Sequence, residues 1–470
     1  MRILLPTGTS TEKLVRCAAA GFNADVVVTG EIASFLTPYM LHTLIKKGTY
    51  DLVIVSGMCT ASFEQVERET GIPVYRGPRH AADLTLILPL LDTITLSRTI
   101  PADDFLAGKR AEDAMNRIGE MEYNAGFDFA IRGTKIGGGS RMKVLAEVMD
   151  AHRVDNILDV VEYCFGSGAD IVDLGFGFDA TPEDVLRVFS LLDDIDLPLA
   201  VDSQDPDLIR TALVRADIVL SLQETNIPEV GSCVADAGAA AVVVPGNSTL
   251  KKNIAMAEQA GIECIIADPL LLPVGSGLVT SLKHFKGTSY PLFFGAGNVV
   301  ELLDADSIGV NALLAGIALE TGASIIFSCE HSDKTRGSIR EMRRATEMMS
   351  LCTGRPYPKD LGIDLLVLKE KRKRREPPLE YDTVTTAKKM PDEITYDPKG
   401  NFRIGIEEDT IIAVIHGKAV QGKRWQDVLY TILSQGDVSC LDHAGYLGRE
   451  LYKAELAIRF GRSFEQDGEF

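Results

Sequence analysis

Between residues 127 and 328 the chain alternates short apolar runs with helix-like segments, and this repeat constrains the fold more than any other feature. A continuous apolar run of this length is typical of a strand buried in a parallel sheet. Eight strand–helix units in succession are the repeat of a (β/α)8 barrel, and a doubly wound sheet is the alternative if the first or fifth strand is misassigned. We therefore expect an α/β protein with a central TIM barrel. The predicted strands are 127–131, 171–174, 199–202, 218–222, 241–244, 264–268, 292–295 and 324–328.

Three aspartates each end one of these runs: Asp173, Asp202 and Asp268. The C-terminal ends of all barrel strands converge on one mouth, where such enzymes keep their chemistry. Carboxylates gathered there repel one another and require a ligand that is cationic or rich in hydrogen-bond donors. A planar pair of N–H groups suits them, because a carboxylate accepts two parallel hydrogen bonds from such a pair. The alternative is that each aspartate only caps the helix after its strand.

The charge balance limits the classes of partner. Asp and Glu number 67 against 48 Lys and Arg, a net charge of −19, which disfavours nucleic acid and anionic membranes as partners. No apolar run approaches the roughly 20 residues of a membrane span. The eight cysteines are scattered without a C-x-x-C pair, which predicts reduced thiols and a cytoplasmic protein. Assembly into a homo-oligomer stays open.

The segments on either side of the barrel differ from it in composition. Glycine turns follow several strands of the first segment, and such turns either hold an anion or only pack. Its expected strands are 3–5, 25–29, 51–56 and 85–89. The predicted domains are an N-terminal doubly wound α/β domain at 1–105, a helical linker at 106–125, the barrel at 126–360, a charged linker at 361–390 that contains the basic run 368–378, and a small C-terminal α+β domain at 391–470.

The segments around the three aspartates resemble those of pterin-binding barrels. Gly168-Ala-Asp-Ile-Val-Asp-Leu-Gly175, Leu199-Ala-Val-Asp-Ser203 and Ala267-Asp-Pro-Leu270 are similar to motifs of dihydropteroate synthases and of pterin-dependent methyltransferases. The whole chain resembles the archaeal dihydropteroate synthase-related proteins of tetrahydromethanopterin-type pathways. The resemblance implies that Asp173, Asp202 and Asp268 are the pterin-site aspartates. The 2-amino-pyrimidinone edge of a pterin offers the pair of N–H donors that they require.

Two motifs depart from the synthase pattern. Where synthases have Ser-Arg-Lys after strand seven, this chain has Gly295-Ala-Gly-Asn-Val299, which is nearer to the methyltransferases. The Arg-x-His that ends strand eight in synthases is missing, and cations further along the chain are candidates to replace it. The other candidate binding residues are Ser221, Glu224 and Asn226 after strand four, Gly275 after strand six, Asn298 after strand seven, Lys334 and Arg336 after strand eight, and Lys135 and Arg141 in the first loop.

Three functions are consistent with these motifs. The first is a transferase of the dihydropteroate synthase type, which condenses a hydroxymethyl-dihydropterin pyrophosphate with an aryl amine. The resemblance implies a phosphorylated aryl amine as the second substrate and Mg2+ as a candidate cofactor. The second function is a pterin-dependent methyltransferase or one-carbon carrier. The third is a non-catalytic module that binds a reduced pterin.

Overall fold

The computed structural model describes residues 1–46, 48–92, 94–355, 357–369, 382–389 and 396–468. The chain forms two compact units. One comprises Met1–Leu303, Ser307–Cys329 and Gly337–Leu365, and the other comprises Asp304–Asp306, Glu330–Arg336 and Leu366–Phe470. The basic run at 368–378 lies outside the described residues except for its first two positions. The domain boundaries given above stay predictions.

The N-terminal part of the first unit is a parallel sheet with strand order β2-β1-β3-β4. In β1, Ile3 and Leu5 belong to one buried cluster and Leu4 to another, because successive side chains of a strand point to opposite faces. Apolar cores on both faces are what a doubly wound domain requires. The elements are β1 Ile3–Gly8, α1 Glu12–Ala19, β2 Ala24–Gly30, α2 Pro38–Ile45, β3 Leu52–Val55, α3 Glu64–Thr70, β4 Val74–Arg76 and α4 Leu84–Ile87.

The strand predicted at 85–89 is wrong. The chain there forms α4 and a 3-10 turn, and the fourth strand of the sheet is β4. Leu84, Ile87 and Leu88 are buried in one cluster, and this spacing of three and four residues is that of a helix face. Downstream, the segment predicted as a helical linker is helix α5, Ala107–Asn124.

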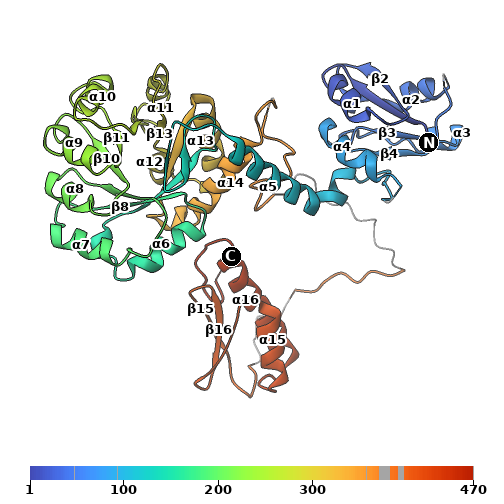
Figure 1. The fold of residues 1–470 in the computed structure, drawn as a ribbon. Coiled ribbons are helices and arrows are strands. Elements are labelled where there is room, and N and C mark those ends of the chain that lie inside the picture. Colours follow the sequence, from blue (N-terminus) through green and yellow to red (C-terminus); the bar gives the residue numbers. More distant parts are fainter. Residues whose placement is uncertain (47, 93, 356, 370–381, 390–395, 469–470) are drawn as a thin grey trace. The chain divides into compact units, whose positions relative to one another are not determined.

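Eight parallel strands form a closed ring, in which β14 pairs with β7 (Figure 1). The predicted TIM barrel is therefore confirmed. The strands are β7 Lys143–Val148, β8 Ile171–Gly175, β9 Leu199–Asp202, β10 Ile218–Leu222, β11 Ala240–Val243, β12 Ile265–Ala267, β13 Leu292–Phe294 and β14 Ala323–Ser328. The helices around them are α6 Ile157–Gly166, α7 Pro182–Ser190, α8 Pro206–Ala212, α9 Ile227–Asp236, α10 Leu250–Gln259, α11 Leu278–Ser281, α12 Ala296–Glu301, α13 Ser307–Thr321 and α14 Ser338–Ser350.

The first predicted strand, 127–131, is not part of the barrel. It contains β5, Phe129–Ile131, which pairs antiparallel with β6, Thr134–Ile136. Arg132 and Gly133 between them both have positive φ, 42° and 81°, as the favoured two-residue hairpin turns require. Ile131 and Ile136 are buried in the cluster that fills the barrel interior, so the hairpin closes the ring at one end. The first barrel strand is β7.

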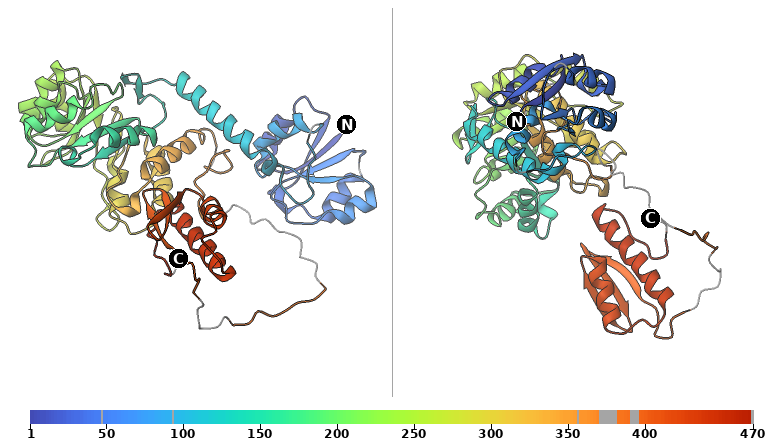
Figure 2. Two further views of the ribbon diagram at one scale, coloured as in Figure 1. Left: turned by 90° about the horizontal axis from the view of Figure 1, so that it is seen from below. Right: turned by 90° about the vertical axis from the view of Figure 1, so that its right-hand side faces the viewer.

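The second unit contains an antiparallel sheet and two helices. Along β16, Ile411, Ala413 and Ile415 are buried and alternate with half-buried residues, as expected for a sheet covered on one face. The helices supply the rest of this core, and Figure 2 shows sheet and helices as two layers. The elements are β15 Arg403–Glu407, β16 Thr410–Ile415, β17 Lys418–Gly422, α15 Trp425–Ser434 and α16 Leu441–Arg459.

Short 3-10 helices complete the described structure: η1 Ala33–Phe35, η2 Ala81–Asp83, η3 Leu88–Leu90, η4 Ala102–Leu106, η5 Ala151–Arg153, η6 Leu282–His284 and η7 Asp333–Thr335. In the parts of the chain that the structure covers, no helix has the length and apolar character needed to cross a membrane.

Candidate functional site

Four carboxylate side chains point into the barrel at the C-terminal ends of its strands. The interior is lined by one apolar cluster, to which most barrel strands contribute. Positions two apart in a strand share a face, so the residue two places after a cluster member also points inward. Four such pairs end in a carboxylate: Leu145 and Glu147, Ile171 and Asp173, Ala200 and Asp202, and Ile266 and Asp268.

The strand-end aspartates do not cap the helices that follow them. Helix α7 begins with a capping box formed by Thr181 and Asp184. The cap of α8 is Asp205, whose side chain accepts from the first backbone N–H groups of that helix. Asp173 and Asp202, which precede these helices, are therefore free of the capping role that was the alternative to ligand binding.

Glu147, Asp173 and Asp202 lie together on three neighbouring strands. One oxygen of each carboxylate lies within 4.8 Å of the other two. The backbone pairing explains this, because Glu147 lies opposite Asp173 and Asp202 lies opposite Gly175. The parallel ladder of β7, β8 and β9 therefore holds three acidic groups in one place. We call these three residues the carboxylate triad.

Asp173 is the most deeply buried member of the triad. Its exposed fraction is 0%, and neither carboxylate oxygen has a hydrogen-bond partner in the described structure. Burial raises the pKa of Asp173 well above its ordinary value, and the negative charges of Asp202 and Glu147 raise it further. A buried carboxylate without donors is costly unless a ligand or a proton neutralises it.

Asp202 is half-buried, and burial raises its pKa, while a hydrogen bond from the Ser221 hydroxyl opposes this rise. Ser221 has a φ of 60°, in the left-handed region, at an irregularity in the pairing of β10. Non-glycine residues rarely adopt this conformation, and such backbone strain concentrates at functional sites. The sequence prediction that Ser221 belongs to the mouth agrees with this position.

Asp268 directly follows β12 and is 7% exposed. The backbone N–H of Leu270 donates to its Oδ1 at 2.8 Å, and Leu270 itself has a φ of 63°. Burial raises the pKa of Asp268 to about 7; the Leu270 hydrogen bond opposes the rise and the charge of Asp202 adds to it. A carboxyl group that titrates near neutral pH can accept hydrogen bonds from a ligand or exchange a proton with it.

Asn298 lies at the end of β13 in the first turn of α12, and it is exposed. A Cβ atom added at Gly295 would lie 3.6 Å from the Asn298 Nδ2, so the amide lies above the end of the strand. Gly275 lies in the loop after Asp268, where it is exposed and has a φ of 86°. Both residues follow strands that end at the mouth, as predicted, and their contact with a ligand stays a prediction.

Glu224 and Asn226 mainly organise the loops after β10. The Glu224 carboxylate accepts from the Asn253 side chain at 2.9 Å and from the backbone of Asn247 at 2.6 Å, and these hydrogen bonds, the Asn253 bond foremost, lower its pKa against a rise from desolvation. Buried Asn226 donates to the carbonyl oxygen of Ser221. These partners use the polar groups that were expected to face a ligand, so a binding role for the two residues is not supported by their contacts.

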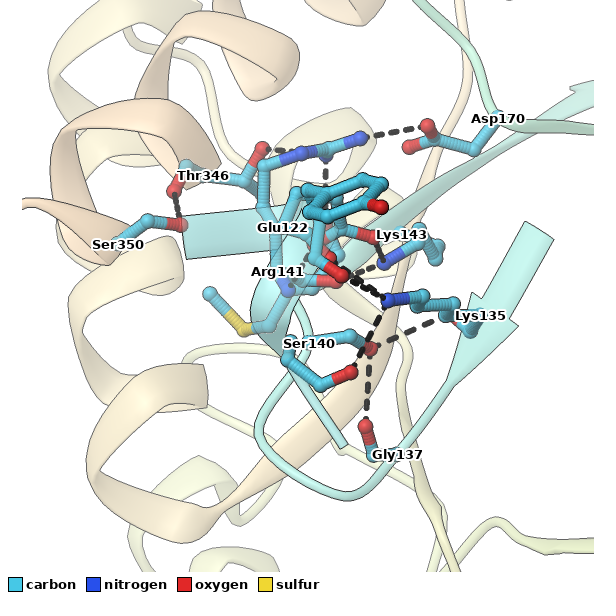
Figure 3. A network of polar contacts seen from close by, with 12 residues as sticks. Glu122, Lys135, Gly137, Ser140, Arg141, Lys143, Asp170, Thr346 and Ser350 are labelled. Atoms are coloured by element: carbon cyan, nitrogen blue, oxygen red, sulfur yellow. Dashed lines mark hydrogen bonds and ion pairs between the residues drawn. The ribbon is translucent and has the colours of Figure 1, made fainter. Parts of the chain in front are cut away.

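Lys135 and Arg141 precede β7 and so lie at the opposite end of the barrel, which corrects their predicted role at the mouth. Figure 3 shows the network of polar contacts that they make. Arg141 Nη2 lies 2.5 Å from Asp170, a residue that directly precedes β8. Lys135 Nζ donates to the carbonyl oxygens of Glu122, Tyr123 and Ala125 at 2.9, 2.9 and 3.0 Å. The apolar run 127–131 predicts a barrel strand with its loop at the mouth, whereas this run forms one arm of the hairpin at the other end.

The same network holds α5 to the barrel. Lys143, buried at the start of β7, lies 2.9 Å from Glu122 and donates to the Arg141 carbonyl at 2.5 Å. Lys135 donates to carbonyl groups at the C-terminus of α5, and its positive charge also interacts favourably with the negative end of the helix dipole. These cations therefore stabilise the end of the barrel that carries no triad.

Replacing Lys135 by alanine is expected to destabilise the first unit by about 1–3 kcal/mol, because three carbonyl groups lose a charged donor. Calorimetric unfolding measures this change. Lys286→Ala removes an exposed lysine and serves as the control, with an expected change within about 0.5 kcal/mol. An unchanged melting temperature for Lys135→Ala would contradict the structural role, and ligand affinity at the mouth is expected to be unaffected.

Lys334 and Arg336 belong to the second compact unit. Lys334 Nζ lies 3.0 Å from Asp304, and Arg336 lies 3.7 Å from Asp409. Each cation thus has an acidic partner within that unit. Their predicted role at the mouth stays a prediction.

Two residues at or near the mouth of the barrel are not among those predicted from the sequence. Glu147 was missed because Lys143 and Glu147 interrupt the apolar character of β7, so the segment did not stand out as a strand. His152, in η5 after β7, is the other: its side chain is 6% exposed and its ring stacks on Phe176. Its Nε2 lies 3.5 Å from Asp179, in the loop after β8. No local motif marks His152; only the folded loops bring it to Asp179.

A curated relative matches almost the whole chain. It is the uncharacterized protein MJ0107 of Methanocaldococcus jannaschii, 34% identical over 517 aligned positions that cover 99% of this chain and 98% of that protein. The chain belongs to the MJ0107 family. A model of a protein family, PterinBD-DUF4346, also matches residues 396–467, which lie in the second unit.

Solved structures are also similar to part of this MJ0107-family protein. Dihydropteroate synthase from Thermus thermophilus has a TM-score of 0.38 at 18% identity and covers 46% of this chain and 95% of its own. Yersinia pestis dihydropteroate synthase with a sulfonamide drug complex has a TM-score of 0.40 at 18% identity, covering 48% and 99%. The assignment of the fold rests on the closed ring of strands itself.

Proposed function

We propose that the mouth of the barrel binds a reduced pterin. The observation that carries the proposal is Asp268, a buried carboxyl group at a strand end that accepts a backbone hydrogen bond from Leu270 and has a pKa of about 7. Its remaining lone pairs suit the two adjacent N–H donors of the 2-amino-pyrimidinone edge. Asp202 would contribute a second acceptor, and Asn298 would supply an amide at the flank. The matched family model, PterinBD-DUF4346, covers residues 396–467 in the second unit, so its description supports a pterin as a ligand of the protein and says nothing of the barrel mouth.

We propose further that the protein is a transferase of the dihydropteroate synthase type. The amine nitrogen of an aryl amine would bond to the methylene carbon of a hydroxymethyl-dihydropterin pyrophosphate, while the carbon–oxygen bond breaks and pyrophosphate leaves with the electron pair. The amine proton would pass to a carboxylate of the mouth whose pKa is raised. The motifs at Asp173, Asp202 and Asp268 support this reaction. A phosphorylated aryl amine is the proposed second substrate.

A second candidate is methyl or one-carbon transfer from a reduced pterin. The strand ends at the mouth carry carboxylates and the Asn298 amide, whereas a bound pyrophosphate would require cations there. This composition favours the second candidate. Lys135 and Arg141, which were expected to supply that charge, lie at the other end of the barrel. A methyl-pterin carries no pyrophosphate, so this reaction does not need a cationic mouth.

The reactions are separated by their products. Calorimetric titration with a reduced pterin is expected to show saturable binding by the full chain. Release of pyrophosphate from the pterin pyrophosphate in the presence of an aryl amine would establish the synthase reaction. Methyl transfer to a corrinoid protein without pyrophosphate release would establish the second candidate, and binding without either product indicates a non-catalytic module. Absence of pterin binding would contradict all three proposed functions.

A further inference from the structure

The mouth contains more carboxylates than the donor edge of a pterin can pair with. The pterin edge uses carboxylates at Asp268 and Asp202, while Glu147 and Asp173 add two more acidic groups beside Asp202. Oxygen atoms of the three triad members lie within 4.8 Å of one another. Two unit charges at about this distance repel by about 3–4 kcal/mol at an effective dielectric constant of about 20. An occupant that offsets this repulsion is therefore expected.

Asp173 indicates where such an occupant lies. Both of its oxygens are buried without a hydrogen bond in the described structure, although the neighbouring strands supply ordinary backbone pairing. Asp170, three residues earlier, shows the contrasting case, because its half-buried carboxylate accepts from Arg141, Arg343 and the backbone of Val144. Asp173 faces only acidic groups in the triad. Its two oxygens are therefore available to a hydrogen-bond donor or a cation.

We propose that the triad binds a divalent cation of the Mg2+, Mn2+ or Ca2+ class. All its donors are carboxylate oxygens, which such hard cations prefer. Ligands on opposite sides of the ion are about 4.2 Å apart for Mg2+ and about 4.8 Å for Ca2+, and the spread of the triad accommodates both. Binding of the cation stands on the triad alone. Its position beside a pterin, through the shared Asp202, rests on the proposed function.

The test uses the full chain, freed of metals with EDTA and then titrated with Mn2+. Electron paramagnetic resonance of free Mn2+ is expected to show one bound ion per chain with a dissociation constant of about 10^-5 to 10^-4 M, displaced by Mg2+ or Ca2+. Glu147→Gln and Asp173→Asn each should weaken binding at least tenfold. Glu224→Gln is the matched control, since it removes the same charge after β10 and lies outside the triad.

Two further measurements keep the outcome clear. Circular dichroism and calorimetry on the metal-free variants check that each still folds, and a metal-dependent rise in melting temperature is expected for the native chain and Glu224→Gln but not for the triad variants. Pterin titration in EDTA tests the proposed function separately, and Asp268→Asn should weaken pterin binding while keeping Mn2+. The proposal is overturned if no Mn2+ binds, or if folded Glu147→Gln and Asp173→Asn bind it as the native chain does.

Discussion

Asp268→Asn is expected to lower the affinity for a reduced pterin by about 2 kcal/mol, which is about thirtyfold. The asparagine keeps the size of the side chain but replaces one acceptor by an NH2 group that faces the donors of the ligand. Calorimetric titration at about pH 8 measures the change. Glu224→Gln is the control, because it removes an equal charge whose hydrogen bonds serve the next loop.

The pH dependence sharpens this prediction. Because the pKa of Asp268 is about 7, the fraction of ionised carboxylate falls below that pH, and the native affinity is expected to decrease by up to tenfold per pH unit. Asp268→Asn should lose this dependence. Weak binding by the variant is not a sign of unfolding, since the ionised Asp268 itself destabilises the fold at pH 8. Equal affinities of the two proteins across this range would show that the assigned pocket is wrong.

Asp170→Asn and Asp173→Asn, three residues apart, are expected to change stability in opposite directions. Asp170 is half-buried and paired with Arg141 and Arg343, and loss of its charge is expected to cost up to about 3 kcal/mol, at the lower end of the range for buried ion pairs. Asp173 has no hydrogen-bond partner among the described residues and lies beside two other carboxylates. Its replacement should therefore stabilise the metal-free protein by about 1–3 kcal/mol at about pH 8.

The two effects differ in their pH dependence. The pKa of Asp173 is raised by burial and by its acidic neighbours, so the unfolded state releases its proton first and stability falls as the pH rises above the unfolded value. The gain from Asp173→Asn should thus vanish near pH 4. The pKa of Asp170 is lowered: burial raises it, but Arg141 and Arg343 outweigh this. Its contribution is complete above the unfolded pKa and is lost as the pH falls through the folded pKa.

Calorimetry is the suitable measurement, because the single tryptophan, Trp425, lies in the second unit and its fluorescence does not report on the barrel. That fluorescence instead provides an internal control for each variant. A destabilised Asp173→Asn protein at pH 8 would mean that its carboxylate has a stabilising partner. It would remove the physical basis for assigning Asp173 as a cation ligand.

Most of the barrel could be predicted because its strands are buried on both faces. Such strands are apolar without interruption, so the runs that end at Asp173, Asp202 and Asp268 were visible, and the parallel order brought their ends together. The exception was β7, in which Lys143 joins the network around α5 and Glu147 joins the triad. The partners of these two charged residues are brought together only in the folded barrel. The sequence of β7 therefore lacks the uninterrupted apolar run that identifies the other strands.

One misassigned element displaced several predicted contacts. The apolar run 127–131, which contains β5, predicts a first barrel strand, and this prediction places Lys135 and Arg141 at the mouth. Local sequence could not prevent this, because the turn at Arg132 and Gly133 distinguishes a hairpin from a loop only once both strands are known. Glu224 and Asn226 were predicted from position alone, and position does not reveal that neighbouring loops already use their polar groups.

The hairpin and the network around Lys135, Arg141 and Lys143 stabilise one end of the barrel, whereas the candidate binding residues lie at the other end. One end is closed and its charges are matched, so it can preserve the fold while loops at the other end change. Substitutions in the loops at the mouth can then change the ligand that binds there while the network at the other end keeps the barrel folded. Relatives in the MJ0107 family that keep the hairpin network therefore need not share a substrate, and each is better assigned from its own strand ends than from overall similarity.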